Sequence, residues 1–419
     1  MYSEGTGMPK DEAEAARWAK KSAEQGNPTG QDILGQLYDK GRGIAHDERK
    51  AVRLLRLSAE QGNKSGQYHL GLMYANGRGV ATNESEAVRW YRKAADQGSA
   101  QAQYELGVIY GNGRGVKRDD SKAVRWFRAA AEQNHSHAQT WLGWMNANGR
   151  GVKKNEAEAV RWYRRAAEQG NAEAANYLCW AIKFGRGAAK DEAEASRWLR
   201  KAAELGNAEA QCNWGAAYEL GNGVPKDHAE AVRWYQKSAD QGYAHASYNL
   251  GEVYANGRGV ATNESEAVRW FRKGAEQGDK DAQTNLAWRH GRGRGVPKDI
   301  SEAIRWYRRA AEQGHHYAQN SLAWWLATSP KDELRNGKEA IVWATRLCEG
   351  SKFKNAGYLD TLAAAYAEAG DFKEALKHCG TSIQLAGQSK LGKDKDESLQ
   401  KLQERQELYR QGKPYRDTE

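Results

Sequence analysis

The sequence repeats on a period of 36 residues, and this period restricts the fold more than any other feature of the chain. The segment YANGRGVATNESEAVRW occupies residues 74–90 and returns unchanged at residues 254–270, five periods later. Tryptophan recurs on the same period at positions 18, 90, 126, 162, 198, 234, 270 and 306, with Leu54 in the remaining register. A constant period of this length predicts a tandem array of one small structural unit.

Each unit is predicted to form two antiparallel helices. Within residues 100–135, apolar residues recur at i, i+4 and i+7 from Ala102 to Ile109 and again from Ala123 to Ala130, which places each set on one helical face. The short loops between these segments favour an antiparallel pair. A hairpin of this size cannot bury its apolar face alone, so stacking between neighbouring units must supply the core.

Both ends of the second helix are marked in every unit. A side-chain oxygen at the predicted N-cap accepts a hydrogen bond from a free backbone N–H, and Asp or Asn holds this position throughout: Asp11, Asp47, Asn83, Asp119, Asn155, Asp191, Asp227, Asn263 and Asp299. Residues that tolerate a left-handed conformation end the helix: Gly26, Gly62, Gly98, Asn134, Gly170, Gly206, Gly242, Gly278 and Gly314. The recurring G-x-G motif, first at 41–43 and last at 293–295, is therefore predicted to be a turn, since a phosphate-binding loop needs a preceding strand.

Small residues at fixed registers predict how the helices pack. Glycine recurs at one register of the first helix, at positions 35, 71, 107, 143, 215 and 251, and Cys179, Ala287 and Ala323 replace it elsewhere. A glycine inside a helix costs about 1 kcal/mol relative to alanine, so its recurrence predicts a close approach to the paired helix. The recurring tryptophan is predicted to fill the space between neighbouring units.

The pattern A-x-A-x-x-x-L-G-x-x-Y-x-x-G-x-G-V, then D-x-x-x-A-x-x-W-Y-x-x-A-A-x-x-G, resembles the Sel-1-like repeat, a branch of the tetratricopeptide (TPR) superfamily. The resemblance covers residues 1 to about 327 and implies an all-α, right-handed superhelical solenoid of about nine 36-residue helix-hairpin repeats. After Ser329 the pattern changes, and residues 358–386 look like an ordinary TPR hairpin. The expected divisions are an incomplete N-terminal repeat (loop and second helix) at 1–27, eight tandem repeats at 28–315, a divergent repeat at 316–352, a TPR-like hairpin at 353–390, and a capping helix and tail at 391–419.

The sequence holds no motif that predicts catalysis, a metal or a cofactor. HExxH and G-x-S-x-G are absent, and the Walker A-like segment GQSKLGKD at 387–394 has Asp394 where a metal-binding Ser or Thr is needed. Cys179 and Cys212 belong to no CxxC pair and are predicted to be small packing residues. Four histidines are assigned to turns between units rather than to a metal site: His135, His137, His315 and His316. We therefore predict a protein without cofactors that is not an enzyme.

Charge and hydropathy bear on the partner and the compartment. The net charge of +10 suits an acidic partner, but the charge is spread along the chain. No stretch approaches the ~18 consecutive apolar residues of a membrane span, and the start MYSEGTGMPKDEAEAARW lacks the features of a signal peptide. Membrane insertion is therefore not expected, and the cytoplasm is favoured. The sequence begins inside a unit, which leaves open self-association through an uncapped N-terminal end.

The resemblance implies that first helices line the concave surface, so partner-binding residues are expected at first-helix registers that vary between units. Exposed aromatic residues commonly anchor a bound peptide, and the alternative is that these tryptophans only pack. The candidates are Trp144, Trp180, Trp288, Trp324, Tyr68, Tyr104, Asn176, Tyr248, Glu252 and Asn320.

Two series of arginines suggest a different ligand. One lies in the loop, at Arg42, Arg78, Arg114, Arg150, Arg186, Arg258 and Arg294, and the other recurs in the second helix from Arg17 onward. Two basic ladders would suit an anionic polymer. The alternative, which the strict period favours, is that each arginine pairs with a nearby acid or with loop carbonyls.

These observations rank three functions. The favoured prediction is a non-enzymatic scaffold that binds an unidentified partner protein or peptide in the concave groove. The second is a basic scaffold for an anionic polymer, either nucleic acid or an envelope glycan. The third, weak hydrolysis of cell-wall-type substrates, is implied by the family resemblance alone, and no catalytic residues support it.

Overall fold

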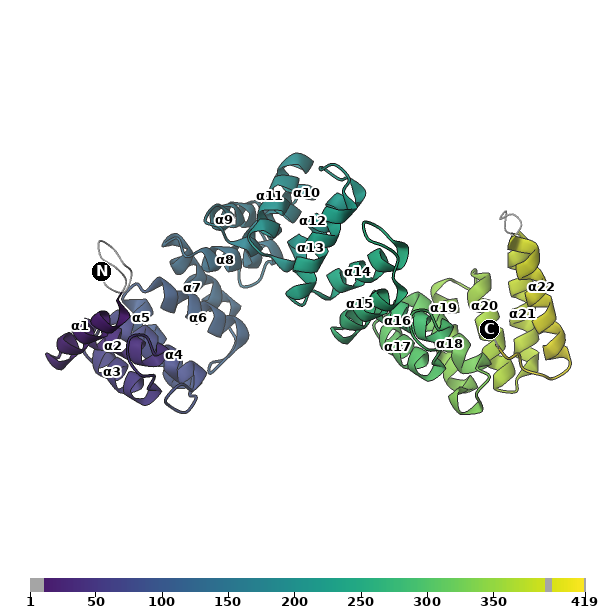
Figure 1. The fold of residues 1–419 in the computed structure, drawn as a ribbon, viewed down its shortest axis with the longest axis horizontal. Helices are drawn as coiled ribbons and strands as arrows, with labels where there is room; N and C mark the ends of the chain where they lie inside the picture. The colour runs from purple at the N-terminus through teal and green to yellow at the C-terminus, as the bar shows by residue number, and fades with distance from the viewer. Residues whose placement is uncertain (1–10, 389–393, 418–419) are drawn as a thin grey trace. The chain divides into compact units, whose positions relative to one another are not determined.

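The structure is a computed structural model that describes residues 11–388 and 394–417, with the backbone alone over 394–398. Within those residues it confirms the all-α array: 22 α-helices and one 3-10 helix, with no strand. The chain forms two compact units, residues 1–207 and 208–419. Figure 1 labels the helices in chain order. Among the described helices, none combines the length and the apolar character that crossing a bilayer requires.

The helices of the first unit are α1 (Glu12–Glu24), α2 (Pro28–Lys40), α3 (Glu48–Glu60), α4 (Lys64–Asn76), α5 (Glu84–Asp96), α6 (Ala100–Asn112), α7 (Asp120–Glu132), α8 (Ser136–Asn148), α9 (Glu156–Glu168), α10 (Ala172–Lys183) and α11 (Glu192–Glu204). Those of the second unit are α12 (Ala208–Leu220), α13 (His228–Asp240), α14 (Ala244–Asn256), α15 (Glu264–Glu276), α16 (Lys280–Arg292), α17 (Ile300–Glu312), α18 (His316–Thr328), η1 (Asp332–Leu334), α19 (Gly337–Gly350), α20 (Ala356–Glu368), α21 (Phe372–Gln388) and α22 (Asp394–Arg410). Each even-numbered helix from α2 to α20 packs against the helix that follows it.

The helix-end signals are confirmed. All nine predicted N-cap side chains accept a hydrogen bond from the backbone N–H three residues later, as Asn83 does from Glu86 at 3.0 Å. All nine predicted stop residues have positive φ, from 64° at Asn134 to 95° at Gly206. Local sequence therefore sets the length of each second helix.

The two glycines of the G-x-G loop are each required for a different structural reason. Gly77 ends α4 in the left-handed conformation, with φ of 68°. Gly79 packs so closely against the start of α3 that an added Cβ would lie 2.3 Å from the backbone oxygen of Glu48. The same contact with the preceding repeat recurs at Gly151, where an added Cβ would lie 2.2 Å from the backbone oxygen of Asp120. The loop is thus a turn between the two helices of one repeat, and its second glycine packs against the preceding repeat.

The mid-helix glycines accommodate a side chain from the paired helix. A Cβ added at Gly107 would lie 2.5 Å from the ring of Phe127, and one added at Gly251 would lie 2.6 Å from the ring of Phe271. The predicted close approach is therefore between a ring and the backbone, and the ring belongs to the residue after the recurring tryptophan position. In the repeat where Cys179 replaces glycine, that residue is a leucine, at position 199, and a leucine, Leu55, also faces Gly35.

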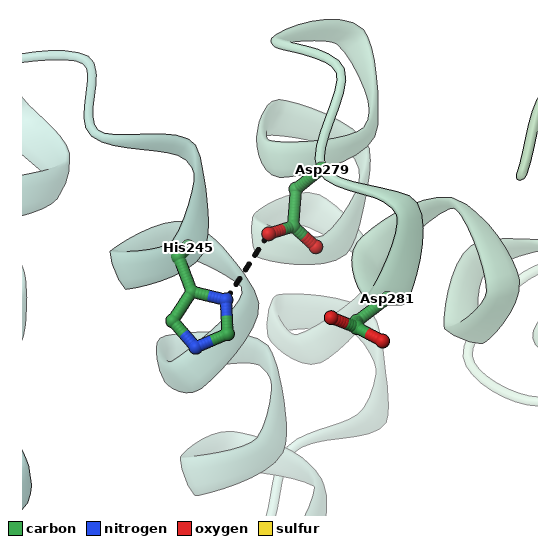
Figure 2. Close-up of side chains that lie close together, drawn as sticks. All are labelled: His245, Asp279 and Asp281. Atoms are coloured by element: carbon green, nitrogen blue, oxygen red, sulfur yellow. Dashed lines mark hydrogen bonds and ion pairs between the residues drawn. The ribbon is translucent and has the colours of Figure 1, made fainter. Parts of the chain in front are cut away.

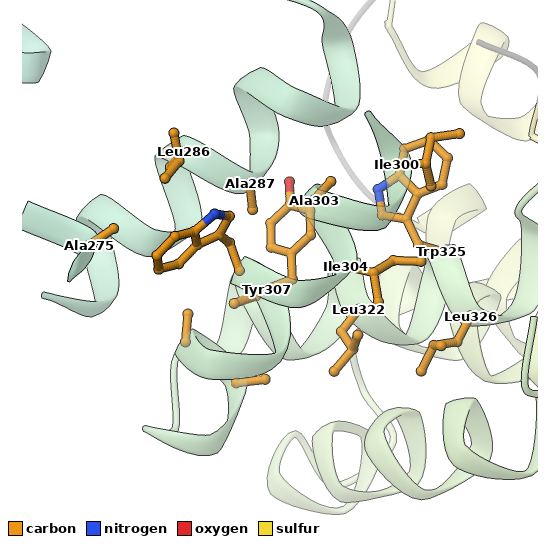
Figure 3. Packing of buried hydrophobic residues seen from close by; sticks show 14 of the residues in the cluster. Ala275, Leu286, Ala287, Ile300, Ala303, Ile304, Tyr307, Leu322, Trp325 and Leu326 are labelled. Atoms are coloured by element: carbon orange, nitrogen blue, oxygen red, sulfur yellow. The ribbon is translucent and has the colours of Figure 1, made fainter. Parts of the chain in front are cut away.

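The core runs along the stack of hairpins. In the second unit, the cluster that contains Leu286 and Trp325 draws residues from α15 through α20 (Figure 3). In the first unit, Trp90 of α5 lies in one cluster with Ala51 of α3 and Leu70 of α4. Trp90 therefore packs between neighbouring repeats, as predicted, whereas Trp18 of the same series is 53% exposed.

Candidate functional site

The first helices of successive repeats lie against one another within each unit. Contacts join α2 with α4, α6 with α8, and α14 with α16. We call the surface made by the even-numbered helices of a unit its first-helix surface. Ten predicted partner-binding residues belong to these helices, so their positions can be compared directly.

The second unit has a hollow of about 570 Å³ in its first-helix surface, which we call the polar hollow. Tyr248, Glu252 and Trp288 all line it, so the structure brings three predicted residues together. Charged or polar residues surround them that were not among the predicted concave-face residues: Glu264, Asp281, Asn285, Arg289, Arg294, His315 and Tyr317. Of these, the sequence had assigned Arg294 to the loop series and His315 to a turn.

Arg289 is the most unusual residue of the polar hollow. Its register is apolar in the described first helices of other repeats, as at Met145 and Val253, yet Arg289 is only 4% exposed. Its guanidinium lies 3.3 Å from the carboxylate of Glu264 and 4.8 Å from the ring centre of Phe271. Burial lowers the pKa of Arg289, and the nearby carboxylates oppose this shift. A comparison of registers between repeats would have revealed this residue from the sequence.

A smaller hollow of about 180 Å³ adjoins the polar hollow, because Trp288 and Tyr317 line both. Asn320 and Trp324, two further predicted residues, line this smaller hollow together with Asp417 from the C-terminal tail. With Trp288, three predicted residues therefore lie together here, beside a segment of the chain itself.

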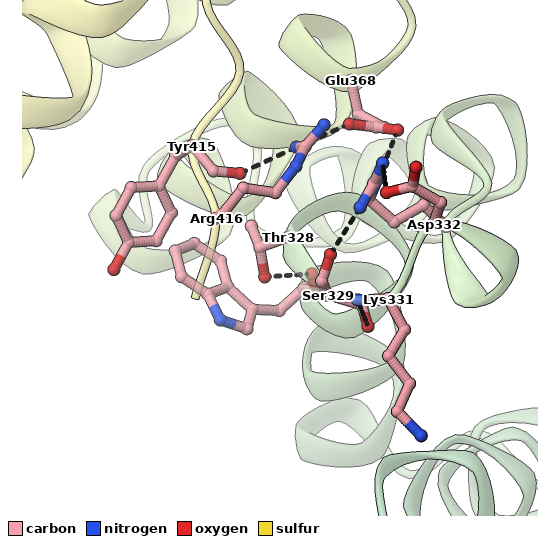
Figure 4. Close-up of polar contacts among 9 residues, drawn as sticks. Thr328, Ser329, Lys331, Asp332, Glu368, Tyr415 and Arg416 are labelled. Atoms are coloured by element: carbon pink, nitrogen blue, oxygen red, sulfur yellow. Dashed lines mark hydrogen bonds and ion pairs between the residues drawn. The ribbon is translucent and has the colours of Figure 1, made fainter. Parts of the chain in front are cut away.

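The C-terminal tail, residues 413–417, runs across Trp324 in a non-helical conformation. The indole N–H of Trp324 donates to the Asp417 carboxylate at 2.7 Å, and the Asp417 backbone N–H donates to the Thr328 carbonyl at 2.8 Å. Figure 4 shows Tyr415 and Arg416 of this tail, with Arg416 2.7 Å from the Glu368 carboxylate. Trp324 thus contacts a segment that contributes both main-chain and side-chain hydrogen bonds.

The first unit has a hollow of about 320 Å³, which we call the aromatic hollow. Trp144 lines it, and its ring lies 5.8 Å from Trp141, which in turn stacks on Phe127 at 6.0 Å. Arg150 lies over Trp144 at 5.1 Å, and Tyr177 completes the aromatic lining. Trp141 and Tyr177 occupy one variable register of the first helix, which sequence reasoning overlooked.

The remaining predicted residues lie outside these three hollows. Trp180 is half-buried and stacks on exposed Phe184 at 5.6 Å. Tyr68 and Tyr104 are half-buried, and Tyr104 stacks on a histidine of the next turn at 4.7 Å. Asn176 is 2% exposed, so its side chain lies inside the unit and not on its surface.

Most loop arginines form ion pairs with an acid of the preceding repeat. The pairs are Arg42 with Glu12, Arg78 with Asp39, Arg150 with Asp120, Arg258 with Glu219, and Arg294 with Glu264. Arg114 and Arg186 are exposed. In the second helix, Arg17, Arg89, Arg161, Arg233, Arg269 and Arg305 each pair with the glutamate three residues earlier. These pairs favour the structural interpretation of both arginine series over a basic ladder.

The four cysteines are buried, as packing residues would be. Burial raises the pKa of Cys212 and Cys379 to about 12 and that of Cys348 to about 11. A reactive cysteine needs the opposite shift, toward the thiolate. Of the Walker A-like segment at 387–394, residues 389–393 lie outside the described part of the chain, as do the first ten residues of the predicted N-terminal repeat.

One group of side chains was not predicted. His245 on α14 lies beside Asp279 and Asp281 at the start of α16, and the three can bring ligand atoms within 4.8 Å of one another (Figure 2). A hydrogen bond with Asp279 raises the pKa of His245. His315, which was assigned to a turn, is the N-cap of α18 and lies 3.2 Å from Asp281.

Comparisons with known proteins agree with this architecture. The Sel1 repeat model matches residues 1–27, 28–63, 64–99, 100–135, 136–171, 172–207, 208–243, 244–279, 280–315 and 316–351. A protective antigen of uropathogenic Escherichia coli strains that displays an SLR fold is 34% identical, with a TM-score of 0.69 over 96% of this chain and 84% of that one. A Sel1 repeat protein from Oxalobacter formigenes is also 34% identical, with a TM-score of 0.55 over 73% of this chain and 88% of that one. No curated protein matches the sequence significantly.

Proposed function

Because this chain belongs to the Sel1 repeat family, we propose that it is a non-enzymatic scaffold that binds an extended segment of a partner protein on its first-helix surface. Repeat proteins of this kind commonly present long surfaces to their partners. The proposed contacts are the polar and small hollows of the second unit and the aromatic hollow of the first.

The contact between Trp324 and the C-terminal tail carries this proposal. The tail meets the first-helix surface as a bound peptide would, since its main chain and a carboxylate both form hydrogen bonds there. The small hollow beside it leads into the polar hollow through Trp288 and Tyr317. A partner segment in the polar hollow would therefore lie next to the tail, and it could form the same kinds of main-chain and carboxylate hydrogen bonds that the tail forms.

The linings suggest which segments would bind. Glu252 and Asp281 face the polar hollow together with Arg289 and Arg294, so it suits a segment with charges of both signs. The aromatic hollow suits an apolar or aromatic side chain. Trp144 and Trp288 are the proposed anchors, one in each hollow.

Selection from a displayed random-peptide library tests this function directly. Peptides selected on the wild-type protein should lose at least about tenfold in affinity when Trp144→Ala and Trp288→Ala are combined, because anchors of this kind contribute more than about 1 kcal/mol. Trp18→Ala is the matched control, since Trp18 is 53% exposed on α1, away from the first-helix surface. Failure to select any peptide, or equal affinity for all three proteins, would overturn the proposal.

Salt dependence separates this function from the alternative of a basic scaffold. Binding of an anionic polymer weakens steeply as salt rises, because counterions are released from the polymer. The paired state of most loop arginines predicts weak, salt-sensitive binding of nucleic acid, whereas apolar peptides selected on the aromatic hollow should bind almost independently of salt.

A further inference from the structure

We infer that His245, Asp279 and Asp281 form a binding site for a divalent transition-metal ion such as Zn²⁺. The site joins two successive repeats of the second unit, since His245 lies in the first turn of α14 while Asp279 and Asp281 lie at the start of α16. Asp281 and His315 also line the polar hollow, but the metal-binding inference does not rest on the proposed function.

The three side chains converge at the spacing of metal ligands (Figure 2). Nδ1 of His245 lies 3.1 Å from Oδ2 of Asp279, and ligand atoms of all three residues lie within 4.8 Å of one another. Zinc bonds of about 2.0–2.2 Å at tetrahedral angles place neighbouring ligand atoms roughly 3.3 Å apart. An ion between His245 and Asp279 therefore requires little movement of either side chain.

Local structure holds the ligands in place. Asp279 is the N-cap of α16, and its Oδ1 accepts the backbone N–H of Ala282 at 2.7 Å, which leaves Oδ2 directed toward His245. One imidazole and two carboxylates form a mixed nitrogen and oxygen ligand set, which suits Zn²⁺ and its neighbours in the first transition row.

His315 is assigned as a positioning residue. Its Nδ1 accepts the backbone N–H of Ala318 at 3.1 Å, so in the neutral ring the proton is on Nε2. That Nε2 lies 3.2 Å from Oδ1 of Asp281, where it can donate to the carboxylate. Ligating carboxylates are commonly held by such outer hydrogen bonds. His315 would orient Asp281 without touching the metal.

The first unit contains a natural control for this site. Three repeats earlier, the equivalent residues are His137, Asn171 and Glu173, so an amide replaces the central carboxylate. Nδ2 of Asn171 lies 3.3 Å from Nδ1 of His137, and Asn171 caps α10 as Asp279 caps α16. The geometry is thus repeated with a residue that is a poor metal ligand.

Titration of metal-stripped, tag-free protein with Zn²⁺, followed by calorimetry, tests the site. We expect one saturable site per chain, and His245→Ala or Asp279→Asn should each weaken it by more than about tenfold, since even outer-shell changes cost 10–100-fold. Asp279→Asn keeps an N-cap residue that the fold already uses at Asn171. His137→Ala should leave Zn²⁺ binding unchanged.

Two further variants make the result decisive. His315→Asn keeps an N-cap but removes Nε2, so it should weaken Zn²⁺ about 10–100-fold while the melting temperature of the metal-free protein stays near the wild-type value. Asn171→Asp should add a second Zn²⁺ site in the first unit. The inference is overturned if the wild type shows no saturable binding, or if His245→Ala and Asp279→Asn bind Zn²⁺ as the wild type does.

Discussion

The aromatic and polar hollows are the same structural site built twice, four repeats apart. Trp144 and Trp288 are equivalent positions, and each hollow also has a loop arginine paired with the first residue of a second helix. The lining differs at five equivalent positions: Val108, Gly111, Trp141, Met145 and Glu173 in the first unit correspond to Glu252, Ala255, Asn285, Arg289 and Tyr317 in the second. A fixed framework therefore carries two different surfaces, so chemical specificity can change without any change in the fold.

The largest expected effect on the free energy of unfolding concerns Arg289, the buried arginine of the polar hollow, whose equivalent in the aromatic hollow is Met145. Glu264→Ala would leave Arg289 buried without its nearest carboxylate, which should cost about 3 kcal/mol of unfolding free energy. Asp120→Ala, at the equivalent position of the first unit, breaks more exposed pairs and should cost less than about 1 kcal/mol. Denaturant titration with hydrogen exchange resolves the two units, because an array of repeats need not unfold in one step.

A double variant provides the control for that comparison. Combining Glu264→Ala with Arg289→Met gives the second unit the apolar side chain that Met145 supplies in the first. Replacing a buried pair by an apolar residue is often neutral, so stability should return close to the wild-type value. Equal losses for Glu264→Ala and Asp120→Ala, with no recovery in the double variant, would contradict a special cost of burying Arg289.

The second prediction exchanges the linings. Trp141→Asn gives the aromatic hollow the residue of the polar hollow, and apolar peptides selected on the wild type should bind about tenfold more weakly, since an aromatic anchor is lost. Charged peptides should keep their affinity. Fluorescence polarisation measures both classes on the same protein, with Asn285→Ala as the variant for the other hollow. A uniform loss across both peptide classes would mean that the two hollows do not differ in specificity.

The fold was predictable because its causes are local and periodic. N-caps such as Asn83 and helix-ending residues such as Gly206 act on backbone groups only a few residues away. Because these signals recur every 36 residues, each unit forms the same helical hairpin. Trp144 and Trp288 could be selected from the sequence because they occupy one register of this period, and their role in binding stays a prediction. The contact of Trp324 with Asp417 joins residues 93 apart in sequence and follows no period, so no pattern could reveal it.

The third prediction contrasts Trp324 with Trp288, its equivalent one repeat earlier. Trp324 donates a hydrogen bond to Asp417 of the tail, whereas Trp288 lines both the polar hollow and the smaller hollow. Asp417→Ala removes the acceptor of the Trp324 indole and should destabilise the end of α18 by about 1 kcal/mol. Hydrogen exchange at residues 324–328 reports this change, and Lys413→Ala is an exposed control in the same tail. Unchanged exchange in Asp417→Ala would show that the tail does not stabilise this part of the surface.

The smallest effect is a pH dependence confined to the first unit. Hydrogen bonds from Arg118 and Arg150 hold the pKa of Asp120 at about 2, below the ordinary value of about 3.9. The unfolded chain therefore takes up the proton first, so the stabilisation is complete above about pH 5 and is lost as pH falls toward 2. These side chains are partly exposed, which limits the contribution to less than about 1 kcal/mol.

Asp120→Asn should remove this dependence. Its stability deficit relative to the wild type should be largest at pH 5 and should vanish near pH 2, and thermal unfolding at low salt across this range measures it. Asp96→Asn is the control in the same unit, since Asp96 is an exposed carboxylate at the end of α5. A deficit that does not change with pH would mean that Asp120 stabilises the start of α7 through its shape rather than its charge. Arg150 would then be held beside Trp144 by the aromatic ring itself, and the shared framework of the two hollows would not need an ion pair.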